Sequence, residues 1–245
     1  MRKILLFLFG LTSVFLQNNS AALGRQSIKV GTSANYAPFE FIDKNGKITG
    51  FEIDIITEIL KNEEYDVVVE DMPFDGLIPA VISGSIDVGA AGLTMTEDKE
   101  KQVSLSKPFF TPSLSIVVKS SDKSIKDMND LVNKRIGAEI ATNGAELAKT
   151  IKGSKTHEFD SVNEAFAALL TNSIDAVISD ADVNAYFFKI TKEKKLKIIA
   201  TSEAMEPYIF ITSLKNKKLI NQINNGIEKI KKNGKYDEIR DKWFK

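Results

Sequence analysis

The chain has 245 residues, enough for one large α/β domain or for two lobes of roughly a hundred residues each. Lysine plus arginine and aspartate plus glutamate both number 33, so no basic excess argues for nucleic-acid binding. The sequence contains no cysteine, which excludes disulfides, thiolate catalysis and a lipid-modified cysteine. Its single histidine, His157, lies in a polar segment that we expect to be an exposed loop. A histidine-based catalytic triad or a multi-histidine metal site is therefore not expected.

Residues 1–22 have the pattern of a secretory signal peptide: a charged start at Arg2 and Lys3, an apolar core, and small residues before a cleavage point after Ala22. The apolar core is too short for a comfortable membrane span. Cleavage removes two of the 33 basic residues and no acidic one, which leaves a net charge of −2. Because nothing anchors the mature chain, we predict a soluble periplasmic protein without cofactor or metal, with ordinary secretion as the alternative.

Predicted strands and helices alternate along the first part of the chain, which indicates a mostly parallel sheet. In order, we predict a strand at 27–32, a loop at 33–39, a hairpin at 41–48, a helix at 51–61, a strand at 65–70 and a helix at 74–82. Glu52 and Asp54 fall in the first turn of the helix at 51–61, where acidic side chains interact favourably with the macrodipole. We expect these two acids to serve the helix and not a reaction.

In the stretch 84–99 we predict the end of a helix, then a buried strand, then a polar segment at the edge of the sheet. Gly84 suits a left-handed helix cap, and residues 86–91 are short and apolar enough for a strand buried on both faces. Thr94 and Lys99 follow at the carboxyl end of that strand, where open parallel sheets bind ligands.

A similar pattern returns at 171–180, where a Ser-Ile-Asp turn leads into an apolar strand that ends in Asp180. A single copy of such a turn is an ordinary connection between a helix and a strand and indicates no function. With two copies, a cation at Lys99 on one rim and an anion at Asp180 on the other would suit a zwitterion held between two similar lobes.

The prolines around 106–112 indicate a crossing between lobes. After it we predict a strand at 114–119, a helix at 127–131, a strand at 134–139, helices at 145–151 and 162–170, a strand at 174–179, a helix at 183–191, a strand at 197–200, a return crossing at 206–212 and C-terminal helices. Thr142 or Asn143 caps the helix at 145–151, and backbone amides there form an anion site, although a cap alone also explains both residues.

Seven short motifs occur in an order that resembles the bacterial extracellular solute-binding proteins of family 3, the amino-acid-binding components of ABC importers. They are Val-Gly-Thr with Tyr-Ala-Pro-Phe-Glu, Gly-Phe-Glu-Ile-Asp, Pro-Phe-Asp-Gly-Leu-Ile-Pro-Ala, Gly-Ser-Ile-Asp, Gly-Leu-Thr-Met-Thr, Leu-Ser-Lys-Pro-Phe and the closing Gly-Lys-Tyr-Asp-Glu-Ile. Each motif is weak alone, but the ordered set is specific and spans nearly all of the mature chain.

The resemblance implies the type II periplasmic-binding-protein fold, in which two α/β lobes joined by two hinge strands close on one ligand. We expect the first lobe at 23–112 plus 206–245 and the second at 113–205. The implied partners are a small amino-acid ligand and the membrane permease of an ABC importer, without nucleic acid, and we expect a monomer.

The resemblance also implies ligand-binding residues. Tyr36 and Phe74 would stack on the ligand side chain, Gly92 and Thr94 would contribute backbone and hydroxyl contacts, Thr142 and Asn143 would bind the carboxylate, and Asp180 would pair with the α-ammonium group. Ser33 stands where relatives that bind cationic side chains often carry aspartate, which argues against lysine or arginine as the ligand. Glu139 ends a strand and either faces the pocket or lies on the surface; we favour the surface.

Lys99 departs from the family, which usually has arginine at this position to grip the α-carboxylate with two hydrogen bonds. Three accounts are open: Lys99 binds a carboxylate less tightly, the ligand is not a standard α-amino acid, or the Asn143 amides have taken over the carboxylate. We favour the first.

The leading hypothesis is a receptor that captures a small polar amino acid, or a related zwitterion, and presents it to a permease. One alternative is a periplasmic dehydratase-like enzyme, for which Lys99 and Glu139 are the only acid and base pair that can be named. A detached sensor domain on the same fold is a third possibility.

Overall fold

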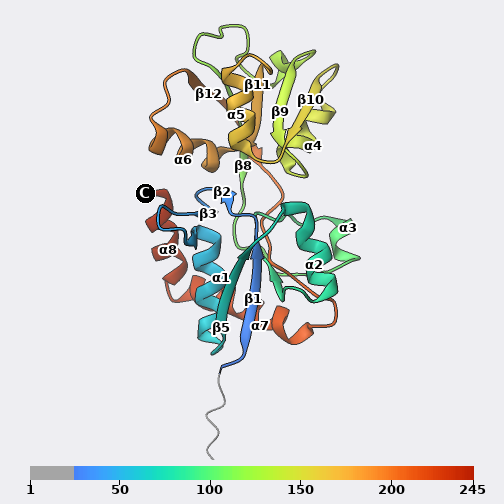
Figure 1. Cartoon of the computed structure of the whole chain (residues 1–245), viewed down its shortest axis with the longest axis vertical. Coiled ribbons are helices and arrows are strands. Elements are labelled where there is room, and N and C mark those ends of the chain that lie inside the picture. The colour runs from blue at the N-terminus through green and yellow to red at the C-terminus, as the bar shows by residue number, and fades with distance from the viewer. Residues whose placement is uncertain (1–24) are drawn as a thin grey trace, which may run out of the picture.

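The computed structural model describes residues 25–245, so the predicted signal peptide lies outside the described residues. Two five-stranded sheets dominate the chain and lie one above the other in Figure 1. The first sheet has the order β5 (Asp66–Asp71), β1 (Ser27–Thr32), β6 (Val88–Gly89), β13 (Ile211–Thr212) and β7 (Ser104–Leu105). The second has the order β10 (Lys155–Phe159), β9 (Arg135–Glu139), β11 (Ala176–Asp180), β8 (Ser113–Lys119) and β12 (Leu196–Ala204).

Both sheets mix parallel and antiparallel pairs. In the first, β1 runs parallel to β5 and β6, whereas β13 is antiparallel to β6 and β7. In the second, β9 runs parallel to β10 and β11, whereas β8 is antiparallel to β11 and β12. We call the parts of the chain built on these sheets the first and the second lobe. The lobe boundaries that we predicted at 112 and 205 stay a prediction.

Eight α-helices lie among residues 25–245, on the sheets and beside the lobe junction (Figure 1). They are α1 (Phe51–Asn62), α2 (Leu77–Ser83), α3 (Glu97–Glu100), α4 (Asn143–Thr150), α5 (Val162–Leu170), α6 (Ala181–Thr191), α7 (Lys217–Lys232) and α8 (Lys235–Phe244). A small hairpin sheet is formed by β2 (Asn35–Tyr36), β3 (Glu40–Ile42) and β4 (Ile48–Thr49). None of the helices in this part of the chain combines the length and the apolar character needed to cross a bilayer.

Most predicted elements are confirmed, with instructive exceptions. Gly84 caps α2 with a left-handed φ of 79°, and α5 has the predicted bounds. The segment around His157, expected to be a loop, is instead the strand β10, although His157 itself is exposed. This polar strand lies at the edge of the sheet and is held by hydrogen bonds to its neighbour β9. Its own sequence therefore needs little apolar character. The predicted helix at 127–131 is a single 3₁₀ turn, Met128–Leu131.

The close packing of α7 on α1 fixes the position of a helix that reaches the lobe junction. Ile55, Ile56 and Ile59 of α1 are fully buried, and Gly226 of α7 lies directly against Ile59. A Cβ atom at Gly226 would lie only 2.4 Å from Cγ2 of Ile59, so only glycine permits this approach. The first turn of α1 carries Glu52, whose position therefore depends on this contact.

We expect Gly226→Ala to lower the free energy of unfolding by about 1–2 kcal/mol. Overpacking against the buried Ile59 costs about 1–3 kcal/mol, and it outweighs the gain of about 1 kcal/mol that alanine brings to a helix interior. Urea denaturation would measure the change. Asn225→Ala, at the exposed neighbouring position, is the control and should leave stability unchanged or raise it. A Gly226→Ala protein as stable as the wild type would contradict the packing argument.

Candidate functional site

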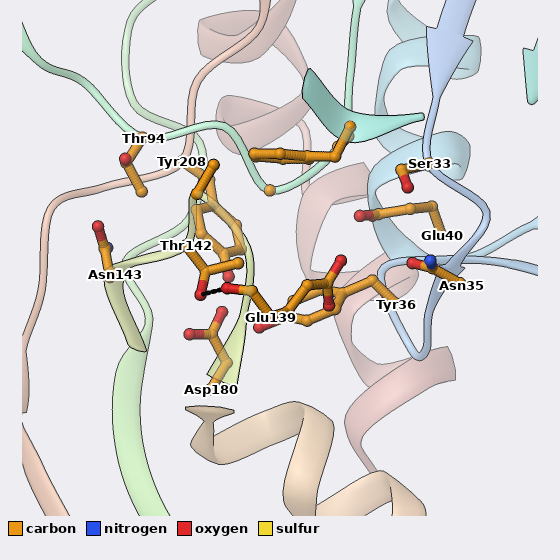
Figure 2. A pocket seen from close by; sticks show the side chains of 14 residues that line it. Ser33, Asn35, Tyr36, Glu40, Thr94, Glu139, Thr142, Asn143, Asp180 and Tyr208 are labelled. Carbon is orange, nitrogen blue, oxygen red and sulfur yellow. Dashed lines mark hydrogen bonds between the residues drawn. The ribbon is translucent and has the colours of Figure 1, made fainter. Parts of the chain in front are cut away.

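A cavity lies where the two lobes meet. Both lobes contribute to its wall (Figure 2). The first lobe supplies Ser33, Asn35, Tyr36, Glu40, Phe74, Ala91, Gly92, Thr94 and Tyr208, and the second supplies Glu139, Ala141, Thr142, Asn143 and Asp180. In Figure 2, Thr142, Asn143 and Asp180 lie on one side of the cavity, and Ser33, Asn35 and Glu40 lie on the other.

Eight of the nine residues that the sequence assigned to the site line this cavity. They are Ser33, Tyr36, Phe74, Gly92, Thr94, Thr142, Asn143 and Asp180. Their ligand contacts stay a prediction, but the chain brings them together from positions up to 147 residues apart.

Lys99, the ninth, is not part of the cavity wall. Its ammonium group donates to the backbone carbonyl of Thr94 at 2.9 Å and to the hydroxyl Oγ1 of the same residue at 3.2 Å. Partial burial lowers the pKa of Lys99, and attraction by Glu206 opposes that change. The cation that we placed opposite Asp180 therefore lies behind Thr94, which does line the cavity.

The start of α4 places the polar side chains of the second lobe. Thr142 is the N-cap, as the sequence predicted: its hydroxyl accepts the N–H of Ala145 at 3.3 Å and donates to the carbonyl of Glu139 at 2.7 Å (Figure 2). Asn143 follows as the first residue of the helix, so its side chain and the free backbone amides of the first turn lie beside the cavity.

Four carboxyl groups are buried in or behind the wall of the cavity. Glu40, Glu139 and Asp180 line it with exposed fractions of 1%, 4% and 4%, and Glu52 lies behind them with 0%. Each has one buried oxygen without a hydrogen-bond partner among the described residues: Oε2 of Glu40, Oε1 of Glu52, Oε2 of Glu139 and Oδ2 of Asp180. No lysine, arginine or histidine lines the cavity within residues 25–245. We call these four residues the carboxyl cluster.

Two members of the carboxyl cluster correct the sequence analysis. Glu139, which we expected on the surface, is buried and faces the cavity. Glu52, which we assigned to the helix dipole of α1, accepts the backbone N–H of Gly92 at 2.7 Å through Oε2. The local sequence pattern does not show where the side chain of either glutamate points. Glu40, Asn35 and Tyr208 also line the cavity and were not predicted, although Glu40 ends the Tyr-Ala-Pro-Phe-Glu motif.

Burial keeps protons on the carboxyl cluster. Burial raises the pKa of Asp180 to about 7, although a hydrogen bond from the Tyr36 side chain lowers it in part. Burial also raises the pKa of Glu139 to about 8, against a hydrogen bond from the backbone of Val162, and it raises that of Glu52 to about 8. The pKa of Glu40 lies well above its usual range because of burial and the neighbouring Glu52. A bound cation would reverse these shifts, so the cavity favours positive charge.

Within residues 25–245 the histidine, aspartate and glutamate side chains form no group of three or more that could hold a metal ion. The carboxyl cluster is therefore better suited to the hydrogen-bonding ammonium or guanidinium group of an organic ligand.

Comparison with known proteins is consistent across sequence and structure. Residues 28–245 match the family described as bacterial extracellular solute-binding proteins, family 3. A probable histidine-binding protein of Campylobacter jejuni is 34% identical over 99% of both chains, and ABC transporter arginine-binding protein 1 of Escherichia coli is 33% identical over 98% of both. An ancestral arginine-binding protein, solved with bound arginine, is 39% identical with a TM-score of 0.84, covering 91% of this chain and all of that one. The two-lobed fold that the resemblance implied is confirmed.

The ligand-free protein should lose stability as the pH rises from 5.5 to 8.5. Asp180, Glu52 and Glu139 hold their protons to pH 7–8 in the folded state, whereas the unfolded chain releases them near pH 4. Over this window the native state binds more protons, so raising the pH favours unfolding. We expect the melting temperature to fall by on the order of 5 °C, measured by thermal unfolding at constant ionic strength.

Asp180→Asn should flatten this pH dependence, since the amide cannot ionise. Asp66→Asn, an identical change at an exposed position of β5, should retain the slope of the wild type. A ligand-free protein whose stability rose between pH 5.5 and 8.5 would contradict the assignment of protons to the carboxyl cluster.

Proposed function

Because the chain belongs to the bacterial extracellular solute-binding proteins of family 3, we propose that it captures an amino acid between its lobes and delivers it to the permease of an ABC importer. The observation that carries this proposal is the cavity at the lobe junction, whose wall combines buried acids from both lobes with the amides and hydroxyls at the start of α4. We propose that the protein works in the periplasm as a monomer. The relatives named above, which are binding proteins, support this function.

The backbone groups of an α-amino acid have suitable partners in the cavity. Asp180 is placed to pair with the α-ammonium group. The carboxylate fits the first turn of α4, where Thr142 and Asn143 stand and where unpaired N–H groups and the macrodipole attract anions. Thr94, backed by the ammonium group of Lys99, provides a third polar contact from the first lobe.

The side chain of the ligand is proposed to be cationic. After Asp180 has paired with the α-ammonium group, Glu40 and Glu139 are still buried without a basic partner in the wall. A buried carboxylate needs an opposite charge to offset its desolvation, and a guanidinium, ammonium or imidazolium group supplies one. Ser33 removes one acidic partner that some relatives have, but these two glutamates supply others. Arginine, histidine and lysine are accordingly preferred over the small polar amino acid that we expected from the sequence.

An enzyme on this fold would need an acid and a base at the substrate. Lys99 and Glu139 were the candidate pair, but Lys99 donates to Thr94 and is not part of the cavity wall. The acids that do line the cavity, Glu40, Glu139 and Asp180, are placed to pair with positive groups of a ligand. Binding is therefore the function that the site supports best, and the absence of turnover of a bound ligand over hours would agree with it.

We expect calorimetry to show binding of L-arginine, L-histidine or L-lysine and much weaker binding of L-glutamine. Glu139→Gln should weaken binding of the cationic ligand by about 30- to 1,000-fold, because it removes one partner of a buried charge pair at a cost of roughly 2–4 kcal/mol. Its effect on L-glutamine binding should be small.

Glu158→Gln is the matched control, since it makes the same change on the adjacent strand β10 at an exposed position that pairs with Lys149. It should bind as the wild type does. Equal affinity of wild type and Glu139→Gln for the cationic ligand would rule out a role of Glu139 in selectivity.

Lys99→Met should weaken amino-acid binding by about 10- to 100-fold, because it removes two charge-assisted hydrogen bonds that orient Thr94 in the cavity wall. Calorimetry would measure the change. Lys101→Met, at an exposed position that pairs with Asp98, is the control and should bind normally. Unchanged affinity of Lys99→Met would assign the carboxylate to the start of α4 alone.

A further inference from the structure

We infer that closure on a cationic amino acid drives protons out of two carboxyl groups of the cavity, Glu139 and Asp180, while a second pair, Glu40 and Glu52, keeps one proton between them. The inference rests on the proposed function and concerns the protons that accompany binding. It makes ligand capture dependent on pH.

Glu139 and Asp180 stand at the carboxyl ends of two paired parallel strands, β9 and β11. Each is 4% exposed and has one buried oxygen that receives no hydrogen bond in the described part of the chain. Two ionised carboxylates held this close in a cavity without a cation would repel each other and lack solvation. In the absence of ligand, protons are the available counter-charge.

The groups around this pair add no positive charge. Glu164 of α5 acts on Glu139, and Asp182 of α6 acts on Asp180; both are acidic and raise the pKa of their neighbour. Tyr36 of β2 is a neutral phenol whose own pKa is raised by burial and by the two acids. Lys99 of α3 directs its ammonium group to Thr94.

The second pair differs because a ligand has access to only one of its members. Glu40 lines the cavity, whereas Glu52 lies behind it on α1 and does not. The N–H of Gly92 satisfies Oε2 of Glu52, but Oε1 of Glu52 and Oε2 of Glu40 receive no hydrogen bond from another group. A proton shared between the two neighbouring carboxyl groups satisfies both oxygens and leaves the pair with a single negative charge.

Ligand binding then exchanges protons for the charges of the ligand. The α-ammonium group takes the place of the proton on Asp180, and the cationic side chain takes the place of the proton on Glu139. With pKa values of about 7 and about 8 in the ligand-free protein, these two groups are substantially protonated at pH 7. Binding at pH 7 is expected to release between one and two protons, and nearly two near pH 5.5, so the affinity should rise by about 10- to 100-fold per pH unit between pH 5.5 and 7.

Calorimetry of the mature protein with L-arginine and L-lysine at pH 7, in phosphate and in Tris, counts the released protons, because the two buffers differ in ionisation enthalpy. L-histidine is tested for binding alone, because its own imidazole takes up a proton when it binds as a cation at this pH. For L-arginine or L-lysine, a buffer-dependent heat that corresponds to between one and two released protons is expected. Glu139→Gln, examined at concentrations that saturate it, should release fewer protons than the wild type, and Glu158→Gln should release the same number. Binding of L-arginine or L-lysine with equal heat in both buffers would overturn the inference and leave the proposed function intact, whereas no binding of any of the three amino acids would overturn both.

Difference infrared spectroscopy separates the two pairs. Addition of the ligand should diminish the carbonyl band of protonated carboxyl groups without abolishing it, and Glu52→Gln should remove part of the band that persists in the complex. A carbonyl band that is absent before ligand is added would overturn the inference, and so would one that disappears completely on binding.

Discussion

The carboxyl cluster without a basic partner is the constraint on which the cavity depends. Burying a carboxylate costs several kcal/mol unless an opposite charge or a set of hydrogen-bond donors replaces the lost water. No basic side chain lines the cavity, and Glu139 and Asp180 each have one buried oxygen without a hydrogen-bond partner among the described residues, so a proton or a cationic ligand is the counter-charge that remains. The proposed selectivity for positive charge and the proposed sensitivity to pH thus follow from one arrangement. A neutral ligand would leave the buried acids protonated and would gain little from their proximity.

The fold creates the carboxyl cluster by bringing distant segments of the chain together at the cavity. The carboxyl ends of β9 and β11 place Glu139 and Asp180 side by side, although 41 positions separate them in sequence. The hairpin strand β3 and the first turn of α1 bring Glu40 and Glu52 to the opposite wall. Close packing of α1 on α7 and the hydrogen bond from Gly92 hold Glu52 in place. Each lobe thus contributes two acids, and it is the meeting of the lobes that encloses all four.

The sequence predicts the course of the chain better than it predicts the direction of individual side chains. Apolar periodicity and capping residues were sufficient for β1 and α5, and the ordered motifs led to eight of the cavity residues. The strand β10 was missed because its partner strand, not its own composition, holds it. Glu52 fits the dipole of α1 whichever way it points, and only the tertiary contact with Gly92 decides. Glu139 likewise ends a strand. The alternation of polar and apolar residues before it does not reveal that β9 is buried on both faces, so the burial of Glu139 could not be predicted.

Lys99 shows how a charge can occupy the expected position and act differently. An arginine there would present a planar fork suited to a carboxylate, whereas the lysine ammonium is a point donor on a flexible stem. In this chain it satisfies both oxygens of Thr94 and takes its charge out of the cavity wall. The wall is therefore more acidic than it would be with an inward-facing cation. Because a cationic amino acid carries two positive groups and one negative group, a site with buried acids and a polar, uncharged carboxylate contact matches that imbalance. On the function proposed here, the lysine and the carboxyl cluster together favour positively charged ligands.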